Sequence, residues 1–281
     1  MTEIGSGATG YTVRDLNTGA SVTLSWAAVS DVGHHRQNNE DSYVVSPPVF
    51  AVADGMGGHS AGDVASDSVV RGLSTLSGNG FTTTDAINSA LRGAVDLLAA
   101  SLGETQQGAG TTVTGAALTC DQDSVRWAVF NIGDSRVYLY YGDKLMQVTT
   151  DDSVVQQLVD AGQITREEAH THPHSNVITR AVGIDDEPIP TYSLFDARPG
   201  MRFLLCSDGL NKEIIDEGIE HYLKTSPTPQ EAVDNLLREA LTNSGRDNIT
   251  IVVVDVHGVT QPMFTGEPSS EDTATGGYVS V

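Results

Sequence analysis

Five short acidic motifs carry the residues of this 281-residue chain that could do chemistry. Each combines Asp or Glu with Gly, Asn or Ser, and four of the five lie beside an apolar run that predicts a buried strand. The motifs occupy residues 39–41, 54–58, 133–136, 207–209 and 245–248. Carboxylates held at strand ends beside glycine supply the hard oxygen ligands that Mg²⁺ and Mn²⁺ prefer. Because gathered carboxylates repel one another, bound cations would stabilise such a cluster.

Two of the motifs repeat one design, in which an aspartate ends an apolar run and a glycine follows it. Asp54 precedes Gly55, and Asp208 stands in the same relation to its own apolar run. Glycine lets the backbone approach a ligand closely and leaves its carbonyl free to bind. A single Asp-Gly pair is usually a plain turn, but two copies, together with Asp134 in a tight link and Asp247 before the last strand, favour a metal site.

The elements that must position these carboxylates are mainly strands. Apolar runs and alternating patterns predict strands from residue 22 onward and at residues 49–53, 111–119, 125–132, 137–141, 191–195, 202–206 and 249–256. Apolar stripes at helical spacing predict helices near residues 65–76, 84–98, 153–161 and 228–245. Most links between strands are short, so we expect antiparallel sheets covered by helices rather than a doubly wound parallel sheet.

Composition restricts the possible partners. The formal net charge is −22, which two divalent ions would hardly offset, so we expect an acidic surface that disfavours nucleic acid and anionic membranes. The two cysteines, Cys120 and Cys206, are interpreted as reduced buried thiols, although a disulfide between them stays open. No apolar stretch approaches the ~20 residues that span a bilayer, and the N-terminus lacks the pattern of a signal peptide. A cytoplasmic location without membrane insertion is therefore expected.

The order and spacing of the motifs resemble those of the metal-dependent serine/threonine protein phosphatases (the PPM family, type 2C). The Gly-Met-Gly-Gly-His sequence after Asp54 resembles the bacterial branch. The matching segments are residues 31–41, 54–59, 108–112, 131–136, 176–183, 204–210 and 245–249. The resemblance covers about residues 22–257 and implies an α+β fold, a four-layer α-β-β-α sandwich of two central antiparallel sheets flanked by helices.

The same resemblance implies a domain organisation. Residues 21–258 would form the phosphatase catalytic domain, and a substrate-selecting flap would occupy about residues 151–180. Residues 1–20, rich in Gly, Thr and Ser, are expected to form a flexible extension that contributes at most one hairpin strand. Residues 259–281 are expected to be a disordered tail.

A site for two Mn²⁺ or Mg²⁺ ions is a further implication of the resemblance. Asp54 would bridge both ions, the carbonyl of Gly55 would bind one, and Asp208 and Asp247 would bind the other. Asp134, with Asp208, would hold a third and weaker ion. Two ions sharing one water give a hydroxide near neutral pH that can attack phosphorus, so the set also makes chemical sense by itself.

Two other residues are implied to serve the substrate. Glu40 would hold a metal-bound water, and Arg36 would clamp the phosphate through its planar guanidinium. A structural ion pair of Arg36 with Glu40 or Asp41 is the alternative. Apart from the resemblance, His59 is a candidate proton donor. The alternatives are a structural role for His59 and protonation of the leaving oxygen by a metal-bound water.

The flap carries one departure from the family pattern. Where the family usually has Asp-His-Ser, residues 151–153 read Asp-Asp-Ser. Asp152 would repel a phosphorylated substrate if it faced the site, or it could cap the following helix. Three alternating histidines at positions 170, 172 and 174 suggest a metal tract, but a surface loop is the favoured interpretation.

These observations predict a Mn²⁺- or Mg²⁺-dependent phosphatase that hydrolyses phosphoserine and phosphothreonine in proteins by a metal-bridging hydroxide. Its partners would be Ser/Thr kinases and their substrates, and we expect it to act as a monomer. Two alternatives remain: a non-catalytic phosphoprotein-binding member of the same fold, and a phosphatase for small phosphate esters. Because no core ligand is missing from the sequence, an active enzyme is favoured.

Overall fold

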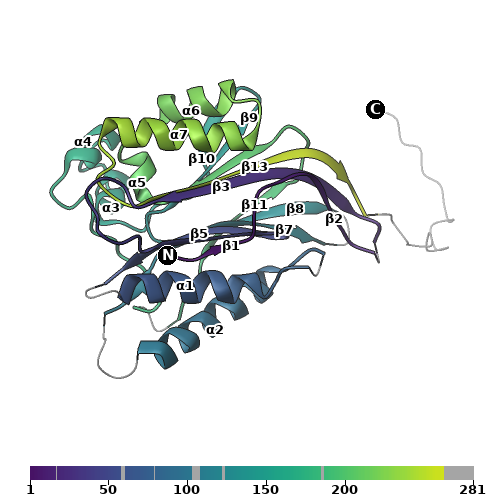
Figure 1. Ribbon diagram of the computed structural model, residues 1–281, viewed down its shortest axis with the longest axis horizontal. Coiled ribbons are helices and arrows are strands. Elements are labelled where there is room, and N and C mark those ends of the chain that lie inside the picture. The colour runs from purple at the N-terminus through teal and green to yellow at the C-terminus, as the bar shows by residue number, and fades with distance from the viewer. Residues whose placement is uncertain are drawn as a thin grey trace, which may run out of the picture.

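Two β-sheets lie face to face, and helices cover their outer faces, so the chain forms four layers in the order α-β-β-α (Figure 1). The computed structural model describes residues 1–16, 18–57, 61–78, 80–102, 108–121, 124–184 and 187–262. The α+β class and the sandwich that the sequence predicts are confirmed.

The first sheet follows the order β1-β4-β5-β7-β8-β11, with β6 paired to β5. Its strands are β1 (Glu3–Ile4), β4 (Asp41–Ser46), β5 (Val49–Met56), β6 (Gly110–Thr111), β7 (Val113–Cys120), β8 (Val125–Ile132) and β11 (Thr191–Asp196). All its pairs are antiparallel except β1 with β4, which run parallel. Short links such as the one between β7 and β8 account for the antiparallel pairing.

The second sheet follows the order β10-β9-β12-β13-β3-β2 and is antiparallel throughout. Its strands are β2 (Ala8–Arg14), β3 (Ser21–Asp31), β9 (Arg136–Tyr141), β10 (Lys144–Gln147), β12 (Arg202–Cys206) and β13 (Ile249–Thr260). The central strands β12 and β13 are buried along most of their length, which matches their continuous apolar sequence.

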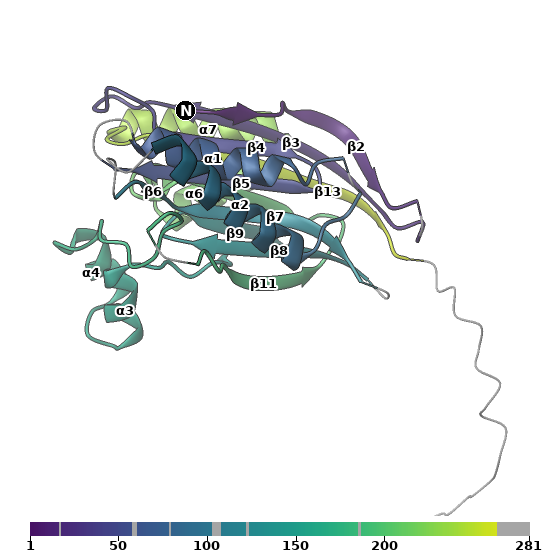
Figure 2. The same ribbon diagram turned by 90° about the horizontal axis from the view of Figure 1, so that it is seen from below.

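Helices from the N-terminal half of the chain cover one sheet, and helices from the C-terminal half cover the other. The helices α1 (Ala61–Ser74) and α2 (Thr84–Leu102) cover the first sheet, and α6 (Asp216–Thr225) and α7 (Pro229–Asn243) cover the second (Figure 1). A short helix, α5 (Asp208–Asn211), follows β12. The flap helices α3 (Val154–Asp160) and α4 (Arg166–Thr171) project from one end of the sandwich (Figure 2).

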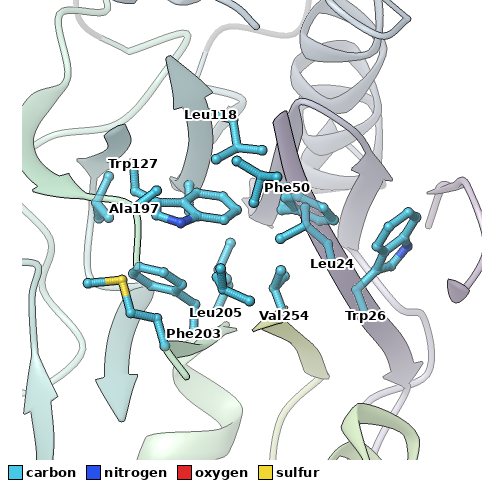
Figure 3. Close-up of a cluster of buried hydrophobic side chains, with 14 of the residues drawn as sticks. Leu24, Trp26, Phe50, Leu118, Trp127, Ala197, Phe203, Leu205 and Val254 are labelled. Carbon is cyan, nitrogen blue, oxygen red and sulfur yellow. The ribbon is translucent and has the colours of Figure 1, made fainter. Parts of the chain in front are cut away.

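The main hydrophobic core fills the space between the sheets (Figure 3). The ring of Trp127 lies between Phe50 and Phe203, with centroid distances of 6.1 and 5.0 Å. Each of these fully buried side chains contributes about 1.5–3 kcal/mol of hydrophobic stabilisation. This rigid core holds the strand ends, and therefore the acidic motifs, in fixed positions.

The structure extends and refines the expected elements. Residues 1–20, expected as a flexible extension with at most one strand, supply both β1 and β2, one to each sheet. The last strand runs to Thr260 rather than to 256, while residues 263–281 lie outside the described part of the chain. The strands β4 and β10 and the helices α4 and α6 were not predicted. Cys120 and Cys206 are free thiols, as expected, but only Cys206 is buried and Cys120 is half-buried.

Candidate active site

The acidic motifs come together at one end of the sandwich because each lies at a strand end. Asp54 lies near the end of β5, and Asp134 follows β8 in the link to β9. From the second sheet, Asp208 follows β12 and Asp247 precedes β13. Asp41 opens β4 and lies directly opposite Asp54 in the β4–β5 register. Both sheets therefore contribute carboxylates to the same edge.

The electrostatics of Asp54 show how closely these acids approach. Burial raises the pKa of Asp54 well above its ordinary value, and the negative charges of Asp41, Asp208, Asp134 and Asp247 raise it further, in that order. Four other carboxylates thus act on one side chain. The arrangement is costly for the protein alone and becomes favourable when cations enter.

Asp41 ties the two sheets together beneath this cluster. Its Oδ2 accepts hydrogen bonds from Ser207 Oγ at 2.8 Å and from Thr250 Oγ1 at 2.7 Å. Ser207 directly follows β12 and Thr250 lies in β13, so both donors come from the second sheet. The pKa of Asp41 is raised to about 7, chiefly by burial and further by the charges of Asp208 and Asp247, while the two hydroxyl hydrogen bonds act to lower it. The carboxyl is fully buried, and its Oδ1 has no hydrogen-bond partner.

Glycine at position 55 is required by the packing of β5 against α1. A Cβ atom built there would lie 2.1 Å from the carbonyl oxygen of Gly62 and 2.6 Å from that of Glu40. The preceding backbone is fixed by hydroxyls, since Asp54 N–H donates to Thr112 Oγ1 at 3.1 Å and its carbonyl accepts from Thr111 Oγ1 at 2.9 Å. The backbone of the Asp54–Gly55 motif is therefore rigid.

Asn248 fixes the loop that carries the basic residue of the site. Its Oδ1 accepts from the backbone N–H of Glu40 at 2.8 Å, and its Nδ2 donates to the carbonyls of Val32 and Asn38, both at 3.0 Å. These bonds hold the segment on either side of Arg36 against the start of β13. The sequence pattern Gly-Arg-Asp-Asn marked this asparagine but did not show its role.

Two protein cations reach into the cluster. An Arg36 NH2 nitrogen donates to Asp247 Oδ2 at 2.7 Å, while the Arg36 side chain stays 54% exposed. The partner is Asp247, so the alternative ion pair of Arg36 with Glu40 or Asp41 is not the one the structure forms. Lys212 contacts Asp208 Oδ2 through its ammonium group. The role of Lys212 could have been suspected from its spacing, four residues after Asp208 on a helical turn.

The donor set fits divalent ions that prefer oxygen. Asp208 Oδ1 is buried and has no hydrogen-bond partner, which is an unfilled requirement that a cation would satisfy. Within the described residues, no three Asp, Glu, His or Cys side chains already form a closed metal site. Arg36 and Lys212 instead hold one oxygen each of Asp247 and Asp208. Metal binding at these two acids would therefore compete with the bound side-chain cations.

Glu40 lies at the rim, beside α1. Burial raises the pKa of Glu40, the charge of Asp63 raises it further, and Arg36 opposes both. Asp63 lies in the first turn of α1, and its Oδ1 is buried without a hydrogen-bond partner. Sequence reasoning did not single out Asp63, and its position three residues into a helix gave no signal for it.

Asp152 lies at the base of the flap and does not cap α3, because Ser153 occupies that position and accepts from Gln156 N–H. Asp152 Oδ2 accepts from Gly133 N–H at 3.0 Å and pairs with Arg180 at 3.3 Å. Its carbonyl accepts from Thr179 N–H at 2.7 Å. The N-cap alternative is therefore wrong, and the carboxylate joins the flap to the loop that carries Asp134.

The histidines contribute less to the described site. His59 lies outside the described residues. His172 is half-buried and His174 is exposed on the flap, and their ring centroids lie 5.5 Å apart. The surface-loop interpretation also missed α4, whose Thr165–Glu168 capping box was a readable helix signal.

A cavity of about 550 Å³ opens beside the acidic cluster, between the flap and the start of α6. Asp134 and Lys212 form part of its wall on the sandwich side, and Gln156 and Arg166 form part of its wall on the flap side. The cluster therefore borders a space large enough for side chains of a bound polypeptide.

Comparisons with known proteins identify a family and several relatives of this chain. The family described as Protein phosphatase 2C matches residues 33–247. The serine/threonine protein phosphatase PstP of Mycobacterium tuberculosis is 41% identical over 260 residues, which are 90% of this chain and 49% of that protein. This chain thus spans about half the length of that relative. The serine/threonine phosphatase stp of Listeria monocytogenes is 34% identical over 239 residues, 80% of this chain and 93% of that protein.

One similar solved structure contains bound metal ions. The catalytic domain of PstP in complex with two manganese ions aligns with a TM-score of 0.76 and 40% identity, over 84% of this chain and 99% of that one. Separately, no helix in the described part of this chain is both long and apolar enough to cross a bilayer.

Proposed function

The chain belongs to the protein phosphatase 2C family, and on this premise we propose that it is a Mn²⁺- or Mg²⁺-dependent phosphatase that hydrolyses phosphoserine and phosphothreonine in proteins. One observation carries the proposal. Carboxylates from both sheets crowd around Asp54, and the buried Oδ1 of Asp208 among them lacks any hydrogen-bond partner. Such a set of oxygens is suited to small divalent ions.

The proposed ligands are Asp54, the carbonyl of Gly55, Asp208 and Asp247. Asp54 lies between acids of both sheets, which supports a bridging role. When bound, two divalent ions would supply an activated water and neutralise the phosphate. The hydroxyls of Thr111 and Thr112 hold the Asp54 backbone, so the protein fixes the position of this proposed ligand.

Arg36 is proposed to bind the substrate phosphate. A single one of its nitrogens donates to Asp247, and the exposed remainder of the guanidinium can donate to phosphate oxygens in a fixed planar geometry. Glu40 lies close enough to Arg36 for their charges to interact. We assign Glu40 to accept a hydrogen bond from water at the rim of the site.

The substrate class rests on the relatives and on the cavity. The PstP and stp relatives are named serine/threonine phosphatases, and the 550 Å³ cavity beside Asp134 offers room for residues that flank a phosphorylated side chain. Ser/Thr kinases and their substrates are the proposed partners, met by a monomeric, cytoplasmic enzyme.

Substitution of Asp208 by alanine tests the metal assignment. We expect Mn²⁺-dependent hydrolysis of p-nitrophenyl phosphate to fall by about 10²-fold or more, since a ligand of the reacting centre is lost. Asp234→Ala, on the exposed side of α7, is the matched control and should keep full activity. Full activity of Asp208→Ala would refute the assignment.

A substrate panel separates the protein phosphatase from its alternatives. Phosphoserine and phosphothreonine peptides and small phosphate esters would be compared at equal concentration by phosphate release. A higher kcat/KM on peptides supports the proposal, and a higher value on small esters would contradict the assigned substrate class. No release from any substrate would favour a non-catalytic binding protein.

A further inference from the structure

Lys212 contacts one of the two acids to which the family resemblance assigns a third ion. That ion was assigned to Asp134 and Asp208. In the structure, the ammonium group of Lys212 contacts Asp208 Oδ2. Lys212 directly follows the short helix α5 and lies one helical turn after Asp208, so the contact is a local one that the fold builds by itself.

The surroundings of Lys212 are acidic on the side of the metal cluster. Lys212 contacts Asp208, and Lys212 and Asp134 line the same cavity. The ammonium group therefore contacts one of the two acids that the third ion would use and shares a cavity wall with the other.

The degree of burial separates this pair from an ordinary surface ion pair. The side chain of Asp208 is 12% exposed and that of Lys212 is 33% exposed. Asp67 and Arg71 form another i,i+4 ion pair, which lies outside the acidic cluster. Both of its side chains are more exposed than their counterparts in the Asp208–Lys212 pair. Lys212 also lines the 550 Å³ cavity, together with Asp134.

We propose that the Lys212 ammonium group replaces the third divalent ion, so that this chain binds two metal ions and uses a tethered cation at the position of the third. The inference rests on the proposed two-metal function. Asp134 then serves as a counter-charge for Lys212 rather than as a metal ligand.

Charge and geometry explain why the replacement would exclude a third ion. A divalent ion between Asp134 and Asp208 would have to displace the ammonium from Asp208 and would be repelled by it at short range. The lysine is covalently attached, so its high effective concentration beside Asp208 favours the ammonium group over free metal. The first two ions are affected less, since they have Asp54 and Asp247 as ligands in addition to Asp208.

Counting bound ions tests the proposal without using activity. Chelator-stripped protein would be dialysed against Mn²⁺ at saturating concentration, and bound metal would be measured by atomic absorption. We expect about two ions per chain for the wild type and about three for Lys212→Asp, which supplies a further carboxylate. Lys212→Met, which removes the charge and keeps the length of the side chain, should also gain the third ion, with weaker affinity.

Two control variants make the count specific. Lys212→Arg keeps a cation at the position and should still bind about two ions. Lys224→Met removes a lysine from an exposed pair with Asp143 and should also bind about two. As an independent readout, the shift in unfolding temperature on adding Mn²⁺ should be larger for Lys212→Met than for the wild type, because the uncompensated acids gain more from the metal.

The possible outcomes are distinct. Three ions in the wild type would overturn the proposal, as would two ions in folded Lys212→Asp and Lys212→Met. If both of these variants fail to fold, the wild-type count decides, since two ions support the replacement and three reject it. A wild-type count of zero would instead refute the proposed two-metal function, and the inference with it.

Discussion

Replacing Asp41 by asparagine should stabilise the metal-free protein at alkaline pH and remove part of its pH dependence. Asp41 is fully buried between the two sheets, and burial raises its pKa from 3.8 to about 7. Because the folded-state pKa lies above the unfolded one, the folded protein holds this proton more tightly. Its stabilising contribution is therefore complete below about pH 4 and is lost as the pH rises through about 7.

The magnitude follows from the shift. A change from 3.8 to about 7, at ~1.4 kcal/mol per pKa unit, costs the folded state about 4 kcal/mol once the carboxyl is ionised in both states. About 2.5 kcal/mol of this loss falls between about pH 5 and about pH 8. In Asp41→Asn that loss is absent, while the amide oxygen can still accept from Ser207 and Thr250.

Urea unfolding of chelator-stripped protein, followed by circular dichroism at both pH values, measures the effect. The wild type should lose about 2.5 kcal/mol more than Asp41→Asn between the two pH values. Asp234→Asn, on the exposed side of α7, should behave like the wild type. Saturating Mn²⁺ should remove part of the wild-type loss, because the ions neutralise the neighbouring acids Asp208 and Asp247. Equal losses in wild type and Asp41→Asn would refute the reasoning that burial and neighbouring charges raise the pKa of Asp41.

Three further substitutions test other parts of the site. Gly55→Ala should lower the free energy of unfolding by at least about 3 kcal/mol, because its Cβ would lie 2.1 Å from the carbonyl oxygen of Gly62; a near-native melting temperature would contradict this packing. Arg36→Lys should reduce kcat/KM by about 10- to 100-fold and leave the number of bound Mn²⁺ ions unchanged, since it keeps the charge and loses the planar donor pair. Asp152→His should raise KM for phosphopeptides more than it changes kcat, because it breaks the link of the flap base to Arg180; steady-state kinetics with neither parameter altered would remove Asp152 from the path of the substrate.

The strands that carry the acidic motifs were predictable because each contains a continuous apolar run. The runs that become β5, β12 and β13 are fully or largely buried, so no polar face obscures the pattern. Short or mixed elements were missed for the opposite reason. The strand β10 alternates exposed and half-buried residues over four positions, and α6 buries only two side chains, so neither leaves a clear period.

In the site, motif residues could be identified, but their partners could not. The sequence marked Asp208, Asp247 and Arg36 through local patterns, whereas the pairing of Arg36 with Asp247 joins residues 211 positions apart. The hydrogen bonds of Asp41 to Ser207 and Thr250 likewise depend on how the two sheets face each other. The roles of side chains that cross between sheets are set by tertiary packing, which no local pattern encodes.

The contacts at the base of the flap determine which part of the flap could be exchanged for that of a related protein. Asp151 forms an ion pair with Arg136 at 2.8 Å, and both side chains are largely buried. Asp152 forms hydrogen bonds with Gly133 and Thr179. Asp151 and Asp152 are therefore fixed to the sandwich. Ser153 then forms an isolated bridge with Ile178. A flap exchange meant to transfer substrate specificity should therefore replace only the residues between Ser153 and Ile178. The contacts at the base of the flap would then stay intact and hold the new segment.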